Sequence, residues 1–181
     1  MDWPRPWHSI LWAPWRLSYI KSEAGKKSEE GCVFCRLAGE EPSPESLVLY
    51  RGKYNYIVMN KYPYNSGHLM VIPYKHTSTI EDLTGESLKE MMLLVKASVK
   101  ALRRVYKPHG FNIGINMGEA AGAGIAEHVH IHIVPRWVGD TNFMTITAGV
   151  KVVPQSLEDA WRSLREVIDD AVSEAMREEK E

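Results

Sequence analysis

Three histidines alternate with apolar residues in the stretch 128–134, which reads HVHIHIV. In a β-strand successive side chains point to opposite faces, so His128, His130 and His132 are predicted to share one face of a strand over 128–135. The apolar residues between them would pack on the other face. Imidazole rings titrate near neutral pH, and a row of three suits nucleophilic catalysis, proton transfer or metal binding. We therefore expect this strand to be the centre of the functional site.

A loop of small residues, GEAAGAG over 118–124, leads into the histidine strand. Such a loop lets backbone N–H groups approach an anion closely, although glycine-rich loops between strands are often only tight turns. Beside the histidines it predicts a phosphate site. The chemistry indicated is attack on phosphorus by the central His130, with a neighbouring histidine assisting the leaving group. Because the free pKa of histidine is about 6.5, a neutral nucleophile is available and a covalent intermediate is expected.

The chain has two cysteines, Cys32 and Cys35, in a C-x-x-C arrangement. In a reducing compartment this spacing indicates metal binding or redox chemistry before a structural disulfide. Redox motifs of the thioredoxin type start a helix within a βαβ pattern, which this region lacks. Zinc fits better if two nitrogen ligands lie nearby, and two ordinary reduced cysteines are the alternative.

Hydrophobic periodicity predicts the elements that position these residues. In addition to the histidine strand, strands are predicted at Leu47–Tyr50, Tyr54–Asn60, His68–Pro73 and Phe111–Met117. Helical spacing predicts a long amphipathic helix over Glu86–Tyr106 and a charged helix within Gln155–Glu179. With 181 residues, 44% of them hydrophobic, the chain can bury one substantial core. We expect an aromatic arm and linker (1–31), a domain (32–154) and a C-terminal helix with a charged tail (155–181).

Charge and hydropathy restrict the partners. Lys and Arg number 22 against 23 Asp and Glu, so the chain lacks a global basic field and nucleic acid is not an expected partner. We see no apolar run long enough to span a bilayer and no signal peptide, which predicts a cytoplasmic protein without membrane contact. Residues 1–20 hold four tryptophans, and this arm is predicted to pack on the domain or on a second subunit.

These motifs resemble a known family. The HVHIHIV stretch resembles the histidine triad (HIT) signature, and GHLMVIP over 67–73 looks like the upstream segment of the same superfamily. Further segments look like the diadenosine tetraphosphate phosphorylase branch: LWAPWR over 11–16, NKYPYNSGH over 60–68, PHGFN over 108–112 and PRWVGDTNF over 135–143. The resemblance covers roughly residues 10–165. It implies an α+β fold, in which a five-stranded antiparallel sheet packs against one long helix and a C-terminal helix, usually in a homodimer.

The resemblance also implies roles for individual residues. His130 would be the nucleophile that takes up a nucleoside monophosphate from a dinucleoside polyphosphate. His132 would contact the phosphate and leaving-group oxygens, and His68 would support the triad from the neighbouring strand. Nucleotide and phosphate contacts are implied for six further residues: Asn60 at the ribose, Val58 at the base, Asn116, Gly122 and Gly124 at the phosphate, and Trp137 at the nucleotide pocket.

Zinc-bearing members of the superfamily imply that His76 and His128 complete a site with Cys32 and Cys35. Such a site would be closed and tetrahedral, and therefore structural. No organic cofactor is expected.

The phosphate loop departs from the family pattern. Many members carry Ser or Thr shortly before the triad, whereas this chain has Ala123, Gly124 and Ile125. None of these side chains can donate a proton, so protonation of the leaving group would come from His132, water or the substrate, and phosphorolysis and hydrolysis both stay open. Three alternatives also stay open: an adenosine phosphoramidase, a nucleotide-binding protein with vestigial catalysis, and a triad that is itself a catalytic metal site.

Overall fold

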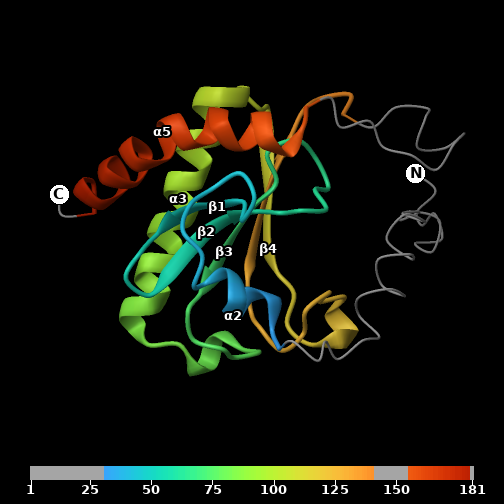
Figure 1. Ribbon diagram of the computed structural model, residues 1–181, viewed down its shortest axis with the longest axis vertical. Helices are drawn as coiled ribbons and strands as arrows, with labels where there is room; N and C mark the ends of the chain where they lie inside the picture. The colour runs from blue at the N-terminus through green and yellow to red at the C-terminus, as the bar shows by residue number, and fades with distance from the viewer. Residues whose placement is uncertain (1–30, 141–154, 180–181) are drawn as a thin grey trace, which may run out of the picture.

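The computed structural model describes residues 31–140 and 155–179 (Figure 1). The aromatic arm predicted for residues 1–20 therefore lies outside the described residues, and so does the end, 141–143, of the segment 135–143 that carries part of the resemblance. Within the described ranges, no helix is long and apolar enough to cross a membrane.

The centre of the fold is a five-stranded antiparallel sheet with the strand order β1-β2-β3-β5-β4. The strands are β1 (Val48–Arg51), β2 (Asn55–Met59), β3 (Leu69–Pro73), β4 (Gly110–Ile115) and β5 (Ile131–Arg136). Every residue of β2 and β3 is buried, which is the expected result of two apolar strands covered on both faces. The fold is α+β, as the sequence predicts.

The strand register assigns residues to the two faces of the sheet. Val58, Met70 and His132 lie directly opposite one another on β2, β3 and β5, and therefore share one face. We call this the histidine face. Phe111 shares the other face with Ile133, and Arg103 of the long helix lies 5.5 Å from the centre of the Phe111 ring. The long helix therefore covers the face opposite the histidines.

Two long helices form the second layer. They are α3 (Gly85–Tyr106) and α5 (Leu157–Arg177), and α5 packs on α3 and on β1 (Figure 1). Each begins at a hydroxyl N-cap: Thr84 accepts from the backbone of Ser87, and Ser156 from that of Asp159. Salt bridges such as that of Lys100 with Glu178 join their exposed sides, where such pairs stabilise little.

Short helical turns complete the architecture. They are α2 (Val33–Leu37), η2 (Ile80–Asp82) and η3 (Glu119–Ala121), and none was predicted, because so few residues carry no helical periodicity. The helix α2 packs on the histidine face through Phe34, which is 3% exposed. The turn η3 lies within the small-residue loop 118–124.

The histidine strand begins three residues later than predicted. β5 starts at Ile131, so His128 and His130 precede the ladder instead of belonging to it. Instead of pairing with a neighbouring strand, the backbone N–H of Val129 donates to the carbonyl of Thr77 (2.7 Å), which follows β3. The segment thus joins the sheet only after His130, which frees the His128 ring to turn toward other partners.

One partly buried side chain fixes the turn between β1 and β2. The carboxylate of Glu90 on α3 accepts hydrogen bonds from the backbone N–H groups of Lys53, Tyr54 and Asn55 and from the Asn55 side-chain amide, at 2.7–2.8 Å. A Cβ atom at Gly52 would lie 2.9 Å from this carboxylate, so only glycine fits there. Glu90 therefore attaches the sheet to the helix layer.

We predict that Glu90→Ala lowers the free energy of unfolding by about 2–4 kcal/mol, because three backbone donors lose a charged acceptor. The matched control is Glu86→Ala, an exposed acid in the same helix, whose loss should cost less than about 1 kcal/mol. Urea denaturation followed by circular dichroism measures both. Equal losses in the two variants would contradict this role for Glu90.

Candidate functional site

His130 is held as a neutral imidazole with a lone pair on Nε2. Its Nδ1 lies 2.8 Å from the carbonyl oxygen of His128, and because a carbonyl can only accept, Nδ1 carries the ring proton. The side chain is 4% exposed and the Phe34 ring packs on it at 4.9 Å. Burial lowers the pKa of His130, against the opposing effect of that hydrogen bond, and so favours the neutral form. Such a ring can act as a nucleophile.

His132 lies beside His130 and is connected to His68. The His130 and His132 ring centres are 4.7 Å apart in a T-shaped contact. The backbone N–H of Tyr64 donates to Nδ1 of His68 (3.1 Å), and Nε2 of His68 lies 2.9 Å from Nδ1 of His132. His68 is 1% exposed. The structure thus brings together the three residues predicted to be catalytic.

The loop between β2 and β3 positions this histidine pair. The Tyr64 ring lies 4.5 Å from the His68 ring and 5.7 Å from the His132 ring, nearly parallel to the latter. The next residue, Asn65, donates its side-chain amide to the Pro135 carbonyl and to the Asp140 carboxylate (3.0 and 2.9 Å). The loop is therefore attached to the end of β5, the strand that carries His132.

Cys32, Cys35, His76 and His128 form a cluster whose candidate ligand atoms all lie within 4.8 Å of one another. Nδ1 of His128 is 3.3 Å from Sγ of Cys32 and 3.6 Å from Sγ of Cys35, and Nδ1 of His76 is 3.3 Å from Sγ of Cys35. Three segments of the chain that are far apart in sequence therefore meet at one point with two sulfur and two nitrogen donors.

These distances fit a metal ion. Around tetrahedral zinc a thiolate sulfur and an imidazole nitrogen are separated by about 3.6 Å, which is close to the observed values. Nε2 of His128 donates to the carbonyl of Pro73 (2.9 Å), so its lone pair is on Nδ1, the atom that faces the cysteines. Burial lowers the pKa of His128, which further favours the neutral, ligating form. The cluster could hold a metal ion.

Two of the predicted nucleotide contacts lie near the histidine pair. Val58 is buried on the histidine face in the same cross-strand row as His132. Asn60 follows β2, accepts from the Tyr62 backbone N–H (2.9 Å) and lines a small pocket that His68 also lines. Both positions are compatible with a nucleoside beside the histidines.

The other predicted contacts lie at the ends of β4 and β5. The Asn116 side chain donates to the Gly122 carbonyl (3.5 Å) and so closes the small-residue loop, which turns at Gly122 with a φ of 79°. Gly124 follows in the same loop. Trp137 lies over the C-terminal end of α3, where its ring packs edge-on against Tyr106 and its indole N–H donates to the Tyr106 carbonyl (3.4 Å).

Sequence reasoning missed Phe34, Tyr64 and Asn65. Phe34 stands between the two cysteines, and its ring contacts both His128 and His130. Tyr64 and Asn65 belong to the segment that resembles the family, yet a loop tyrosine and asparagine carry no pattern that indicates a role. Only the contacts across the fold identify them.

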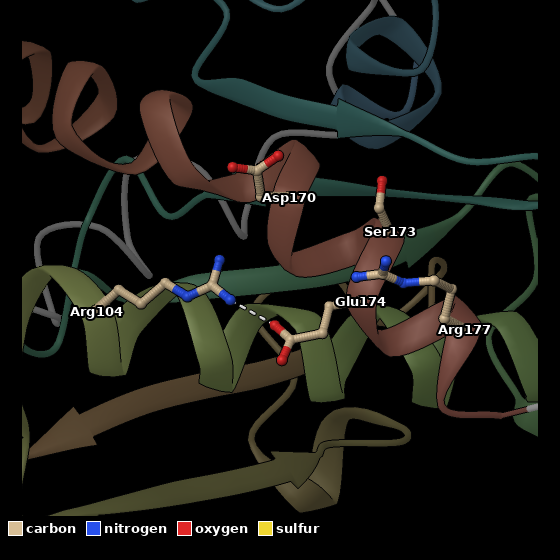
Figure 2. Close-up of a pocket in the computed structure, with 5 residues that line it drawn as sticks. All are labelled: Arg104, Asp170, Ser173, Glu174 and Arg177. Atoms are coloured by element: carbon tan, nitrogen blue, oxygen red, sulfur yellow. Dashed lines mark hydrogen bonds and ion pairs between the residues drawn. The ribbon is translucent and has the colours of Figure 1, made fainter. Parts of the chain in front are cut away.

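A second pocket lies away from the histidines predicted to be catalytic. Figure 2 shows a pocket between α3 and α5 that is lined by Arg104, Asp170, Ser173, Glu174 and Arg177. Arg104 pairs with Glu174 across it. The residues are those of an exposed charged helix pair, where solvent screens the charges, so the histidine face is the better candidate.

Comparisons with known proteins agree with this site. A family model described as the HIT domain matches residues 41–138, a range that starts after the two cysteines. A Mycobacterium tuberculosis protein named AP-4-A phosphorylase is 43% identical over 159 residues, which are 85% of this chain and 81% of that protein. The asymmetrical bis(5'-nucleosyl)-tetraphosphatase of Schizosaccharomyces pombe is 35% identical over 95 residues, 52% of each chain.

A solved structure has the same fold. The zinc-bound histidine triad family protein of Mycobacterium smegmatis superposes with a TM-score of 0.61 at 27% identity, covering 81% of this chain and 99% of that one. Because the family model spans residues 41–138 of 181 and the M. tuberculosis relative covers 85% of the chain, this protein belongs to the HIT (histidine triad) family.

Proposed function

We propose that this protein cleaves dinucleoside polyphosphates, such as diadenosine tetraphosphate, through a nucleotidyl intermediate on His130. The observation that carries the proposal is the neutral His130 ring, whose Nδ1 proton is held by the His128 carbonyl so that Nε2 can attack. The names of the M. tuberculosis phosphorylase and the S. pombe tetraphosphatase support the substrate class. Phosphate or water would be the acceptor.

The reaction has two steps. In the first, Nε2 of His130 bonds to the α-phosphorus, the bond from phosphorus to the bridging oxygen breaks, and ATP leaves with the electron pair. In the second, an oxygen of phosphate or water bonds to the same phosphorus and His130 is released, giving ADP or AMP. His132 would contact the leaving oxygen, and Asn116, Gly122 and Gly124 would hold the phosphoryl oxygens.

Nucleoside binding is assigned to the remaining predicted residues. Asn60 would bind the ribose, Val58 would contact the base, and Trp137 would shape the nucleotide pocket. The adjoining positions of Val58 and Asn60 near His68 support the first two roles.

The metal in the proposal is zinc, held by Cys32, Cys35, His76 and His128. Two sulfur and two nitrogen donors suit zinc, and the zinc-bound M. smegmatis relative supports the assignment. When bound, zinc would supply a structural cross-link between α2 and the segment that precedes β5. Its two thiolates require a reducing environment, which agrees with a cytoplasmic protein.

The proposal includes a homodimer through the edge of the sheet at β4. Ile113, Ile115 and Met117 are 47%, 36% and 45% exposed, and β4 pairs only with β5 within the described part of the chain. An exposed apolar edge strand is a liability in a monomer, and a second copy would cover it.

The first test is product analysis. With diadenosine tetraphosphate and phosphate we expect ADP plus ATP, and with water as acceptor AMP plus ATP. His130→Ala should lower the rate by about a thousandfold or more, because the nucleophile is lost. Chromatography of the nucleotides measures the products, and the mass of the protein quenched in denaturant at alkaline pH, where the phosphorus–nitrogen bond survives, should rise by one AMP unit.

His109→Ala is the matched control, since His109 is exposed in the turn after α3. Its activity should equal that of the wild type. Full activity of His130→Ala, or no cleavage by the wild type, would disprove the proposed function.

The second test is metal content. Protein purified without chelator should contain about one zinc per chain, and Cys32→Ser should lose it together with about 5 °C or more of Tm, since metal binding stabilises the folded state. Elemental analysis and calorimetry measure the two effects, and His109→Ala should leave the zinc content unchanged. Absence of zinc from the wild type, with unchanged stability of Cys32→Ser, would refute the site.

The third test concerns the dimer. Ile113→Glu places a charge on the exposed face of β4 and should convert the dimer to a monomer in light scattering. Met92→Glu is the matched control, because Met92 is 59% exposed on α3, and it should stay dimeric. A monomeric wild type, or a dimeric Ile113→Glu protein, would argue against this interface.

A further inference from the structure

One peptide group connects the nucleophile to the loop that follows β3. The carbonyl of His128 and the N–H of Val129 belong to this group, and in a planar trans peptide they point in opposite directions. The carbonyl accepts from Nδ1 of His130 (2.8 Å), and the N–H donates to the carbonyl of Thr77 (2.7 Å). Thr77 therefore holds one side of the peptide group, while the other side holds His130.

These two hydrogen bonds act in series. An amide that donates through its N–H is polarised, so its carbonyl becomes a stronger acceptor. Because the peptide group is planar, the bond at Thr77 also sets the direction in which the His128 carbonyl meets the His130 ring. The sheet does not orient this group, since β5 begins only at Ile131. The orientation of the His130 imidazole thus depends on the position of the Thr77 carbonyl.

Thr77 is itself fixed by its side chain. The residue is 6% exposed, and its hydroxyl donates to the Asp82 carboxylate at 2.6 Å, a distance typical of charge-assisted hydrogen bonds. The same hydroxyl accepts from the backbone N–H of Thr79 (3.3 Å). The side chain of Thr77 therefore stabilises the loop conformation that presents its carbonyl to Val129.

Asp82 is anchored at the end of η2. Its backbone carbonyl accepts from Nζ of Lys75 (2.7 Å), and the next residue, Leu83, is buried in the core. Asp82 thus binds the chain at Lys75 and at Thr77, on both sides of His76. One acidic residue therefore fixes the loop from which Thr77 reaches the peptide group beside the nucleophile.

We propose that Thr77 and Asp82 are positioning residues for His130, which orient the peptide group between residues 128 and 129 and through it the attacking imidazole. The inference rests on the proposed function, in which Nε2 of His130 attacks phosphorus, and it adds two residues outside the histidine strand. Both act through the main chain. A rotation of the peptide group would turn the His130 ring and misalign the attack.

The first experiment removes the Thr77 hydroxyl. Thr77→Val has nearly the same shape without a hydroxyl, whereas Thr77→Ser retains one. In Thr77→Val we expect kcat for diadenosine tetraphosphate to fall about tenfold or more and KM to change less than about twofold, because the nucleophile is misaligned and substrate binding is untouched. Thr77→Ser should keep kcat within about twofold of the wild type. Wild-type kcat in Thr77→Val, or equal losses in both variants, would overturn the proposal.

Thr84→Val is the matched control, because the Thr84 hydroxyl caps α3 and does not belong to the loop after β3. It should lower Tm by about 2–4 °C through the lost cap and leave kcat unchanged. The zinc content of each variant should equal that of the wild type. A comparable loss of kcat in Thr84→Val would assign the effect to general stability, and a loss of zinc from Thr77→Val would assign it to the metal cluster; either result would contradict the inference.

The second experiment tests whether the two residues act together. Asp82→Ala removes the acceptor of the Thr77 hydroxyl and should lower kcat to about the level of Thr77→Val. The double variant should lose no more than either single variant, since both substitutions remove the same hydrogen bond. Losses that multiply in the double variant would argue that the residues act separately and against the proposal.

The third experiment needs no substrate and separates the inference from the proposed function. NMR of the full chain with labelled valine and histidine follows the Val129 amide and the Nδ1 proton of His130. In Thr77→Val the amide should exchange with solvent about tenfold faster, and the Nδ1 proton should move upfield as its hydrogen bond weakens. Both signals should stay unchanged in Thr84→Val.

Unchanged signals in Thr77→Val would refute the positioning role. If the wild type cleaves no dinucleoside polyphosphate, the proposed function fails, and these two signals still decide whether Thr77 holds the peptide group that orients His130.

Discussion

Three backbone groups that cannot exchange donor and acceptor roles set the protonation of the site. The Tyr64 N–H, acting through His68, fixes His132, while the carbonyl groups of His128 and Pro73 fix His130 and His128. Each tautomer thus depends on the main chain and not on a neighbouring charge. A free imidazole can carry its proton on either nitrogen, and the fold removes that choice at His68, His128, His130 and His132.

Burial lowers the pKa of His128 and His130 and favours their neutral forms, against the opposing effect of the hydrogen bonds to the backbone carbonyls. His128 is fully buried and His130 nearly so, and an ionised ring at either position would lose its hydration. A strand that stayed in the ladder from residue 128 would hold both rings at regular strand spacing. Because the segment joins the sheet only at Ile131, His128 can turn to the cysteines while His132 stays on the histidine face.

The sequence predicts regular elements and repeated patterns well, because these depend on local spacing. The helical period of α3, the two buried central strands and the alternation that separates His132 from Ile131 and Ile133 are all found. Local spacing does not predict contacts between segments that are distant in sequence. The four hydrogen bonds of Glu90, the five-residue helix α2 and the contact of Tyr64 with His132 join residues that no local pattern relates.

His128 links the candidate metal centre to His130, the proposed nucleophile. His128 directs its ring to the cysteines and its carbonyl to His130, so a displacement of the His128 backbone moves the group that holds the His130 proton. Phe34 stands between the two cysteines in the sequence, and its ring packs on both His128 and His130 and so restricts their positions further. A cation bound at this cluster would fix Cys32 and Cys35 against His128 and would thereby help to orient His130 without touching the substrate.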